Sequence, residues 1–266
     1  MSMQTVKRQF DKIGARAKLR FEERRAQRTD VSIDVGHDDE GEFFDISLRQ
    51  NAGAELSVVD ARPQMRHLLL MSRQHDGKHK FLCGHDERHW FVAAVPERLS
   101  VSNVKTAFEA LKPQDVRQRQ EWLKVKRKNR NRRRNEAFVR QGEWFFLPMP
   151  ASFEPDPRIV LANEPLRRGM GKPHVCEELV RQGGEVVYVS VRYPNGVTEA
   201  QFRKLTSRNA KLRDLNWSAQ RRNPGVFVRG KVRHADHKTI VLTGWHQVLM
   251  NTETQSVAMR HVAFID

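Results

Sequence analysis

The chain has 266 residues, enough for one large or two ordinary domains, and its hydrophobic fraction of 38% is adequate for a core. No apolar run approaches the roughly 20 residues that a membrane span needs, and residues 1–30 lack the apolar core of a signal peptide. Cys83 and Cys176 lie far apart, which is typical of a reducing cytoplasm and not of a disulfide scaffold. The formal net charge of +16 is concentrated in patches, which favours an anionic partner.

The first segment is basic and is predicted to be a helix over residues 6–28. Apolar residues recur there at helical spacing, at Val6, Phe10, Ile13, Ala17 and Phe21. Gly14 weakens this prediction because glycine is a poor helix former. The alternative is a basic arm that becomes ordered on nucleic acid.

Residues 31–112 contain short β-type runs separated by turn-like stretches such as GHDDEG and QNAG. The runs HKFLC and HWFVAAVP flank Gly84, Asp86 and Glu87 and predict a hairpin. Residues 101–111 have helical spacing, and Pro113 stops that helix. Helix is expected to resume at Asp115 and to run into the basic segment that follows.

The remainder of the chain alternates strands with polar loops. RQGEWFFLP, RIVLA, EVVYVSVRY, VFVRGKVRH, KTIVLT and WHQVLM are predicted strands, and MRHVAFID closes the chain as another. HVCEELVRQGG is predicted to be a short helix or extended turn, and residues 209–225 a loop. Thr198 is expected to cap a helix, because its hydroxyl can accept an orphan backbone N–H.

These elements predict an α+β fold with two β-rich halves, each sandwich- or barrel-like, joined by a basic helix-linker and preceded by an N-terminal helix. The expected parts are a basic helix or arm at residues 1–30, a β-rich domain at 31–112, the helix-linker at 113–137 and a second β-rich domain at 138–266.

Residues 138–266 resemble a family of β-rich bacterial and phage proteins of uncharacterised activity. The shared features are an opening strand of the Arg-Gln-Gly-Asp type, a Gly-His-x-His phrase, and a His-x-x-His hairpin before a final strand. Their counterparts are residues 140–143, 171–176, 234–237 and 242–248. Glu143 replaces the Asp, and the Gly-His-x-His phrase has become Gly-Lys-Pro-His-Val-Cys. The resemblance implies a compact β-rich domain and no known activity.

The segment at residues 117–134, called the basic segment below, carries ten Lys or Arg and one Glu in eighteen positions. Phosphate neutralisation with release of counterions predicts nucleic-acid binding here, with RNA slightly favoured over DNA. No sequence-reading motif is present, so no base readout is expected. The alternative is a solvated linker or helix face. Candidate phosphate and base-stacking residues are Arg117, Arg119, Lys124, Lys126, Arg127, Lys128, Arg130, Arg132, Arg133, Arg134, Trp122 and Trp217.

A second set of residues suggests a metal. His174 and Cys176 alternate on an extended segment, so they point to the same side, and His234 and His237 bracket a turn. Imidazole and thiolate together suit one Zn²⁺ or Fe²⁺, with Glu177 or Glu178 as the general base on its water. The alternative is that the histidines face water or phosphate and that Cys176 is an ordinary buried side chain; the protein then has no cofactor.

The hairpin phrase GKHKFLCGHDERHW also holds several possible ligands, at His79, Cys83, His85, Asp86, Glu87 and His89. Their spacing matches no standard zinc module. The favoured interpretation is a turn with solvated polar residues and a buried Cys83. A composite site that joins this phrase to the histidines of the second half stays open.

Three functions follow in order. The first is a non-enzymatic nucleic-acid-binding protein, the second a metal-dependent hydrolase or nuclease, and the third a basic subunit of a phage, ribosomal or defence complex. The sequence leaves open whether the protein is an enzyme.

Overall fold

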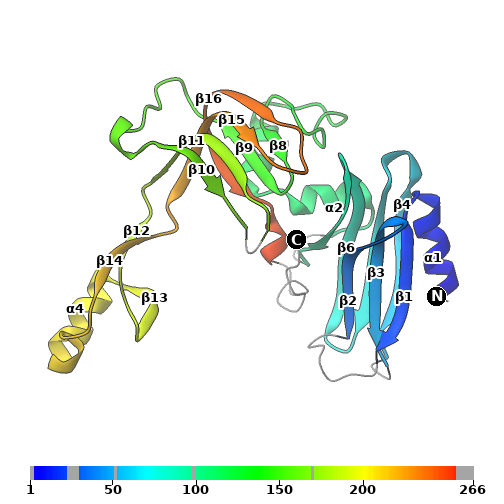
Figure 1. The fold of residues 1–266 in the computed structure, drawn as a ribbon, viewed down its shortest axis with the longest axis horizontal. Coiled ribbons are helices and arrows are strands. Elements are labelled where there is room, and N and C mark those ends of the chain that lie inside the picture. Colours follow the sequence, from blue (N-terminus) through cyan, green and yellow to red (C-terminus); the bar gives the residue numbers. More distant parts are fainter. Residues whose placement is uncertain (1–2, 23–29, 51–52, 98–99, 169–170, 256–266) are drawn as a thin grey trace.

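The computed structural model describes residues 3–22, 30–50, 53–97, 100–168 and 171–255. They form an α+β fold of two β-rich halves with a smaller lobe at one end (Figure 1). The predicted fold class is confirmed. Each of its four sheets has a linear strand order, so the described strands form open sheets and no closed barrel. Among the described residues, no helix has the length and apolar character needed to cross a bilayer.

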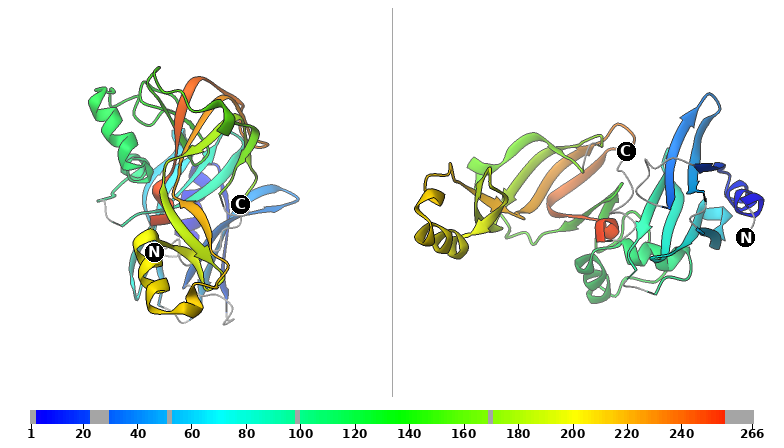
Figure 2. Two further views of the ribbon diagram at one scale, coloured as in Figure 1. Left: turned by 90° about the vertical axis from the view of Figure 1, so that its left-hand side faces the viewer. Right: turned by 90° about the horizontal axis from the view of Figure 1, so that it is seen from below.

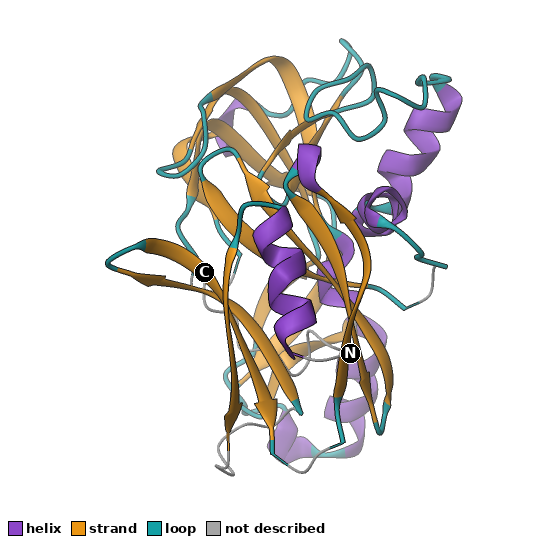
Figure 3. Ribbon diagram, turned by 90° about the vertical axis from the view of Figure 1, so that its right-hand side faces the viewer, coloured by secondary structure: helices purple, strands orange, loops and turns teal. Residues whose placement is uncertain are grey.

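The N-terminal half is built from two sheets that pack face to face, with a helix beside them (Figure 3). One sheet has the order β1-β3-β2 and the other β4-β5-β6-β7. Phe10 of the helix contacts the ring of Phe44 at 4.9 Å between ring centroids. The elements are α1 (Met3–Lys12), β1 (Arg16–Glu22), β2 (Val31–Asp38), β3 (Gly41–Arg49), β4 (Glu55–Arg62), β5 (His67–Gln74), β6 (Gly77–Asp86) and β7 (His89–Val95).

The run HLLLM in β5 is apolar without interruption because both faces of its sheet are covered. Leu68 and Leu70 face the core shared with the first sheet, whereas Leu69 packs under α2 (Val104–Leu111). Asn103 caps α2 by accepting the backbone N–H of Thr106. The hairpin predicted between β6 and β7 is confirmed.

The N-terminal helix is shorter than residues 6–28. It ends at Lys12, Gly14 takes a left-handed φ of 75°, and the chain continues as β1. β1 pairs with β3 in parallel, so Ala17 lies opposite Phe44 in the core. Burial against a sheet therefore overrides the helical spacing beyond Gly14. Residues 23–29 lie outside the described part of the chain.

The expected helix-linker is a helix followed by a folded loop. α3 (Gln114–Trp122) ends because Lys124 adopts a φ of 50°, and the N–H groups of Lys124 and Val125 donate to the carbonyls of Glu121 and Gln120. This is a Schellman ending, and the buried Val125 supplies its usual apolar contact. The helix therefore does not continue through the basic segment.

The C-terminal half is a six-stranded sheet of order β10-β11-β15-β16-β9-β8. Residues 174–182, expected as a helix or turn, form the strand β11, because Leu179 and Val180 are buried between strands on both sides. The strands are β8 (Val139–Gln141), β9 (Trp144–Pro148), β10 (Leu161–Leu166), β11 (His174–Gln182), β15 (Gly225–Arg233) and β16 (Ile240–Met250).

A smaller lobe lies between β11 and β15 in sequence and projects from the end of the molecule (Figure 2). It contains β12 (Glu185–Ser190), β13 (Tyr193–Thr198), β14 (Ser218–Arg222) and α4 (Glu199–Arg208). Thr198 caps α4 as predicted. The strand β14 replaces part of the loop expected at residues 209–225, because it pairs with β12 along residues 218–222.

The end of β16 returns to the N-terminal half. The Thr252 hydroxyl donates to the carbonyl of Ala110 at 2.6 Å, and Glu253 accepts the backbone N–H of Ala94 at 3.2 Å. Arg168 pairs with Glu253 at 2.8 Å, and both side chains are mostly buried. The two halves are thus joined by polar contacts as well as by the chain.

His67 gives the fold a pH dependence. Burial, partly against the rings of Phe91 and Phe108, lowers the pKa of His67. The unfolded chain takes up a proton near pH 6.5 and the folded chain only at lower pH, so stability is lost as the pH falls below about 6.5. We expect His67→Phe to flatten urea-denaturation stability between pH 6.5 and 5 by up to about 1.4 kcal/mol per pH unit. An unchanged pH slope would contradict this.

Candidate functional site

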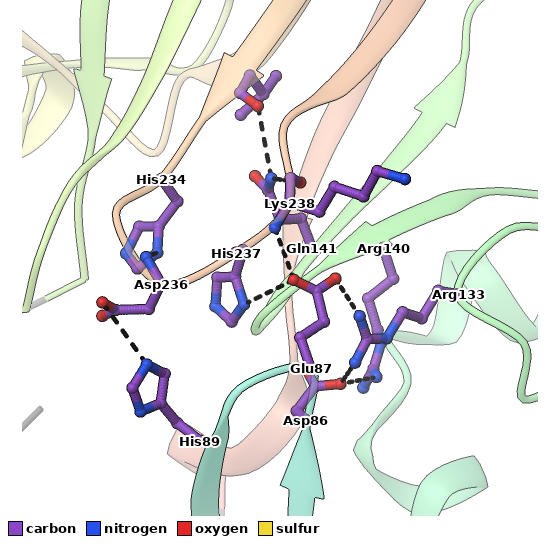
Figure 4. Close-up of polar contacts among 11 residues, drawn as sticks. Asp86, Glu87, His89, Arg133, Arg140, Gln141, His234, Asp236, His237 and Lys238 are labelled. Atoms are coloured by element: carbon purple, nitrogen blue, oxygen red, sulfur yellow. Dashed lines mark hydrogen bonds and ion pairs between the residues drawn. The ribbon is translucent and has the colours of Figure 1, made fainter.

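The turn between β6 and β7 carries two carboxylates into the C-terminal half (Figure 4). Asp86 and Glu87 both accept hydrogen bonds from the guanidinium of Arg133, and Arg140 lies 3.4 Å from Asp86. Glu87 also accepts the backbone N–H of Lys238 at 2.6 Å. One turn therefore fixes the end of the basic segment and the loop between β15 and β16. We call Asp86, Glu87 and Arg133 the carboxylate clamp.

Three histidines meet beside this clamp. His174 begins β11, whereas His234 and His237 lie in the loop that joins β15 to β16. β11 pairs with β15, with Val175 opposite Arg233, so the loop folds over the start of β11. One ring nitrogen from each histidine lies within 4.8 Å of the others, and the rings are stacked, with centroids 4.2 Å apart for His174 and His234. We call these residues the histidine cluster.

His174 is the buried member of the histidine cluster. Its side chain is only 2% exposed, and among the described residues neither ring nitrogen has a hydrogen-bond partner. Burial, with the nearby His234 and His237, lowers the pKa of His174 to about 3. The ring is therefore neutral at physiological pH, and its unshared electron pair is available.

The other two histidines are held by their surroundings. His234 Nδ1 accepts the N–H of Asp236 at 3.1 Å, so in the neutral ring Nε2 donates to the carbonyl of Lys172 at 3.2 Å. His237 Nδ1 lies 3.7 Å from a Glu87 oxygen. Burial, followed by the field of His234, lowers the pKa of His237. Glu87 thus faces one side of the His237 ring and leaves the opposite nitrogen toward the cluster.

Gly142 gives the histidine cluster its space. It forms the turn between β8 and β9 with a left-handed φ of 56°. A Cβ atom at this position would lie 2.9 Å from His237 Nε2 and 3.5 Å from His174 Nε2. A side chain here would therefore both strain the turn and crowd two of the imidazoles.

A cleft of about 470 Å³ lies between the halves and reaches the histidine cluster. The hairpin turn contributes Asp86 and His89 to its wall, and the basic segment contributes Asn131 and Arg132. Lys172 and Asp236, which pair at 2.9 Å, line the end near the histidines. The cleft thus connects the basic segment with the histidine cluster.

The remaining residues of the predicted metal site lie elsewhere. Cys176 is fully buried in the core, and burial raises the pKa of its thiol to about 12. Glu177 accepts the backbone N–H of Lys231 at 2.7 Å, and Glu178 pairs with Arg229. Neither glutamate lines the cleft. The structure therefore separates them from the three histidines, because a bulge in β11 turns this part of the strand outward.

The basic segment is folded on the C-terminal sheet. Val116, Val125 and Phe138 pack against Phe145 of β9. Buried Lys112 and Gln120 donate to the carbonyl of Arg130 at 2.9 and 2.7 Å. Six of the ten basic side chains are exposed, namely Lys124, Lys126, Arg127, Lys128, Arg132 and Arg134, while Arg117, Arg119, Arg130 and Arg133 are partly buried.

Acidic partners account for little of this charge. In the part of the chain that the structure describes, Arg133 is the only one of the ten that pairs with acidic side chains. It turns inward to the carboxylate clamp, against the expectation of a phosphate contact. Trp122 is 76% exposed. Trp217 instead stacks on Tyr193 and donates to the carbonyl of Leu212, so it serves the core of the smaller lobe.

The hairpin phrase divides between the two interpretations given to it. Cys83 is buried in the core and its pKa is raised by burial, and His79 hydrogen-bonds Asp76. Glu87 and His89 instead reach the second half, where His89 lies 3.8 Å from Asp236. Spacing alone did not identify the clamp, because its partners come from a turn 46 residues away in the chain.

Comparison with known proteins identifies no relative: no protein-family model, curated protein or solved structure matches the chain. The resemblance of residues 138–266 to a bacterial and phage family stays a prediction.

The clamp predicts a contrast between two neighbouring arginines. Arg133→Ala leaves two carboxylates without their shared cation and should lower the free energy of unfolding by about 1–2 kcal/mol. Arg132→Ala removes an exposed side chain and should change it by less than about 0.5 kcal/mol. Urea denaturation of both variants measures the difference, and equal stabilities would show that the clamp contributes nothing.

Proposed function

We propose that the protein binds nucleic acid through its phosphate backbone, using the exposed side chains of the basic segment. The observation that carries this proposal is that exposed cations are gathered on one folded loop and not neutralised by the protein's own carboxylates. Lys126, Arg127 and Lys128 are consecutive and exposed, and within the described residues none of them forms an ion pair. A polyanion would release its counterions on meeting them.

The anchoring of the basic segment supports binding because it limits the entropy lost on association. Val125 and Phe138 are buried on either side of the exposed part, and Lys112 and Gln120 hold the Arg130 carbonyl between them. A loop already ordered in the free protein loses less freedom when it binds than a disordered tail would. The inward turn of Arg133 belongs to the same anchoring.

Trp122 favours a single-stranded ligand. It lies at the end of α3, immediately before the cluster of exposed cations, and offers an indole that is 76% exposed. An exposed aromatic ring next to phosphate-binding side chains can stack on an unpaired base. Proteins read RNA mainly through such unpaired bases, which is why RNA is slightly favoured over DNA as the ligand.

The salt dependence of binding tests the contacts with phosphate. Replacing Lys126, Arg127 and Lys128 by Gln should weaken binding to single-stranded RNA. It should also lower the slope of log affinity against log salt by about 0.7 per lost contact, or about 2 in all. Fluorescence anisotropy across a salt series measures both quantities.

A matched control removes the same charge elsewhere. Lys204, Arg208 and Lys211 are exposed on the smaller lobe, and their replacement by Gln should leave the salt slope unchanged. If the two triple variants lose affinity equally, general charge attracts the ligand and the basic segment is not its site.

Stacking is tested separately. Trp122→Ala should weaken binding of single-stranded RNA about tenfold and leave duplex binding unchanged, because paired bases offer no free face to the indole. The salt slope should stay at the wild-type value, since no phosphate contact is lost. An equal loss for both ligands would place the effect of Trp122 in the folding of the loop.

A further inference from the structure

The histidine cluster has features that the proposed nucleic-acid surface does not explain. His174 is 2% exposed with both ring nitrogens unbonded, although buried polar atoms are normally hydrogen-bonded. Its ring stacks on two further imidazoles. Leaving polar groups buried without partners costs about 1–3 kcal/mol, so such an arrangement calls for a ligand.

The surroundings of the cluster suit a cation. Each histidine offers a ring nitrogen within 4.8 Å of the other two. Gly142 keeps open the space beside Nε2 of His174 and His237, which a Cβ would crowd. Glu87 faces His237 Nδ1 at 3.7 Å. A carboxylate on the far nitrogen is the usual device that orients a metal-binding imidazole and raises its basicity.

We propose that His174, His234 and His237 bind one divalent transition-metal ion, Zn²⁺ or Fe²⁺, at the junction of the two halves. Imidazole is a good ligand for both ions. His234 contributes by exchanging one of its backbone hydrogen bonds, to Asp236 or to Lys172, for the metal. The buried, neutral His174 needs no such exchange.

The site is of the open kind. The described histidines, cysteines and carboxylates supply three ligands to the cluster and no fourth. Cys176, one residue pair further along β11, is directed into the core. A site with three protein ligands leaves a position for water or an exogenous group, and here the cleft adjoins it. Lys172 and Arg132 in the cleft wall favour an anionic ligand at that position.

The carboxylate clamp couples this site to the N-terminal half. Glu87 belongs to the hairpin β6–β7, whereas all three histidines belong to the C-terminal sheet and its loops. Glu87 also accepts the N–H of Lys238, immediately after His237. Glu87 is thus a positioning residue: it orients His237 and holds its loop without contacting the metal.

Metal content and affinity test the proposal on the full-length protein. Purified protein incubated with Zn²⁺ and desalted should retain one equivalent by elemental analysis, and Co²⁺ should give the visible absorption of a low-coordinate site. His174→Ala should weaken Zn²⁺ binding by more than about 100-fold, and Glu87→Gln by about 10- to 100-fold. Gly142→Ala should also weaken binding, although it removes no ligand.

His89→Ala is the matched control, since His89 lines the same cleft outside the histidine cluster. It should retain wild-type affinity, and thermal unfolding without metal confirms that each variant is folded. Zn²⁺ should raise the unfolding temperature of wild type and of His89→Ala but not of His174→Ala. Failure of wild type to retain Zn²⁺, Fe²⁺ or Co²⁺, or equal binding by all variants, would overturn the proposal. Neither result bears on RNA binding by the basic segment.

Discussion

The turn at Asp86 and Glu87 is the contact on which the arrangement of both candidate surfaces depends. Two carboxylates at the tip of one hairpin would repel each other, so their placement requires the cation that Arg133 supplies. Glu87 takes a left-handed φ of 52° there, an unusual backbone conformation for a side chain of its size. In return, the turn reaches the N–H of Lys238 and the ring of His237. The basic segment and the histidine loop are therefore held by the same two residues.

The basic segment combines two roles that its composition does not separate. Arg133 turns inward and pins the end of the segment, whereas Arg132 beside it is exposed at the cleft. Buried Lys112 acts in the same way as Arg133, because its ammonium group holds the Arg130 carbonyl and the carboxylate of Glu109. Cations that pair within the protein keep the loop in place, and this leaves their neighbours free to meet an anionic polymer.

Much of the fold could be predicted from local pattern. The β6–β7 hairpin, the cap at Thr198 and the α+β class follow from turn residues and periodicity. The helix expected through Phe21 was wrong because residues 16–22 pair with β3, a contact that periodicity cannot show. The prediction for residues 174–182 failed for a similar reason, since burial between two neighbouring strands outweighed the helix-favouring Glu-Glu-Leu.

The candidate site was predictable in its ligands and not in its environment. His174, His234 and His237 were identified from residue type and spacing, and the structure brings them together. Cys176 has the same strand parity as His174, but parity fixes a face of the sheet and not the depth along it, so the thiol lies in the core. Gly142 and Glu87 gave no local signal. Their importance arises from close approach between segments far apart in sequence, a turn that lacks a side chain and a turn that supplies one. The chemistry of the cluster is thus set by the packing of two halves, and each half contains only part of the site.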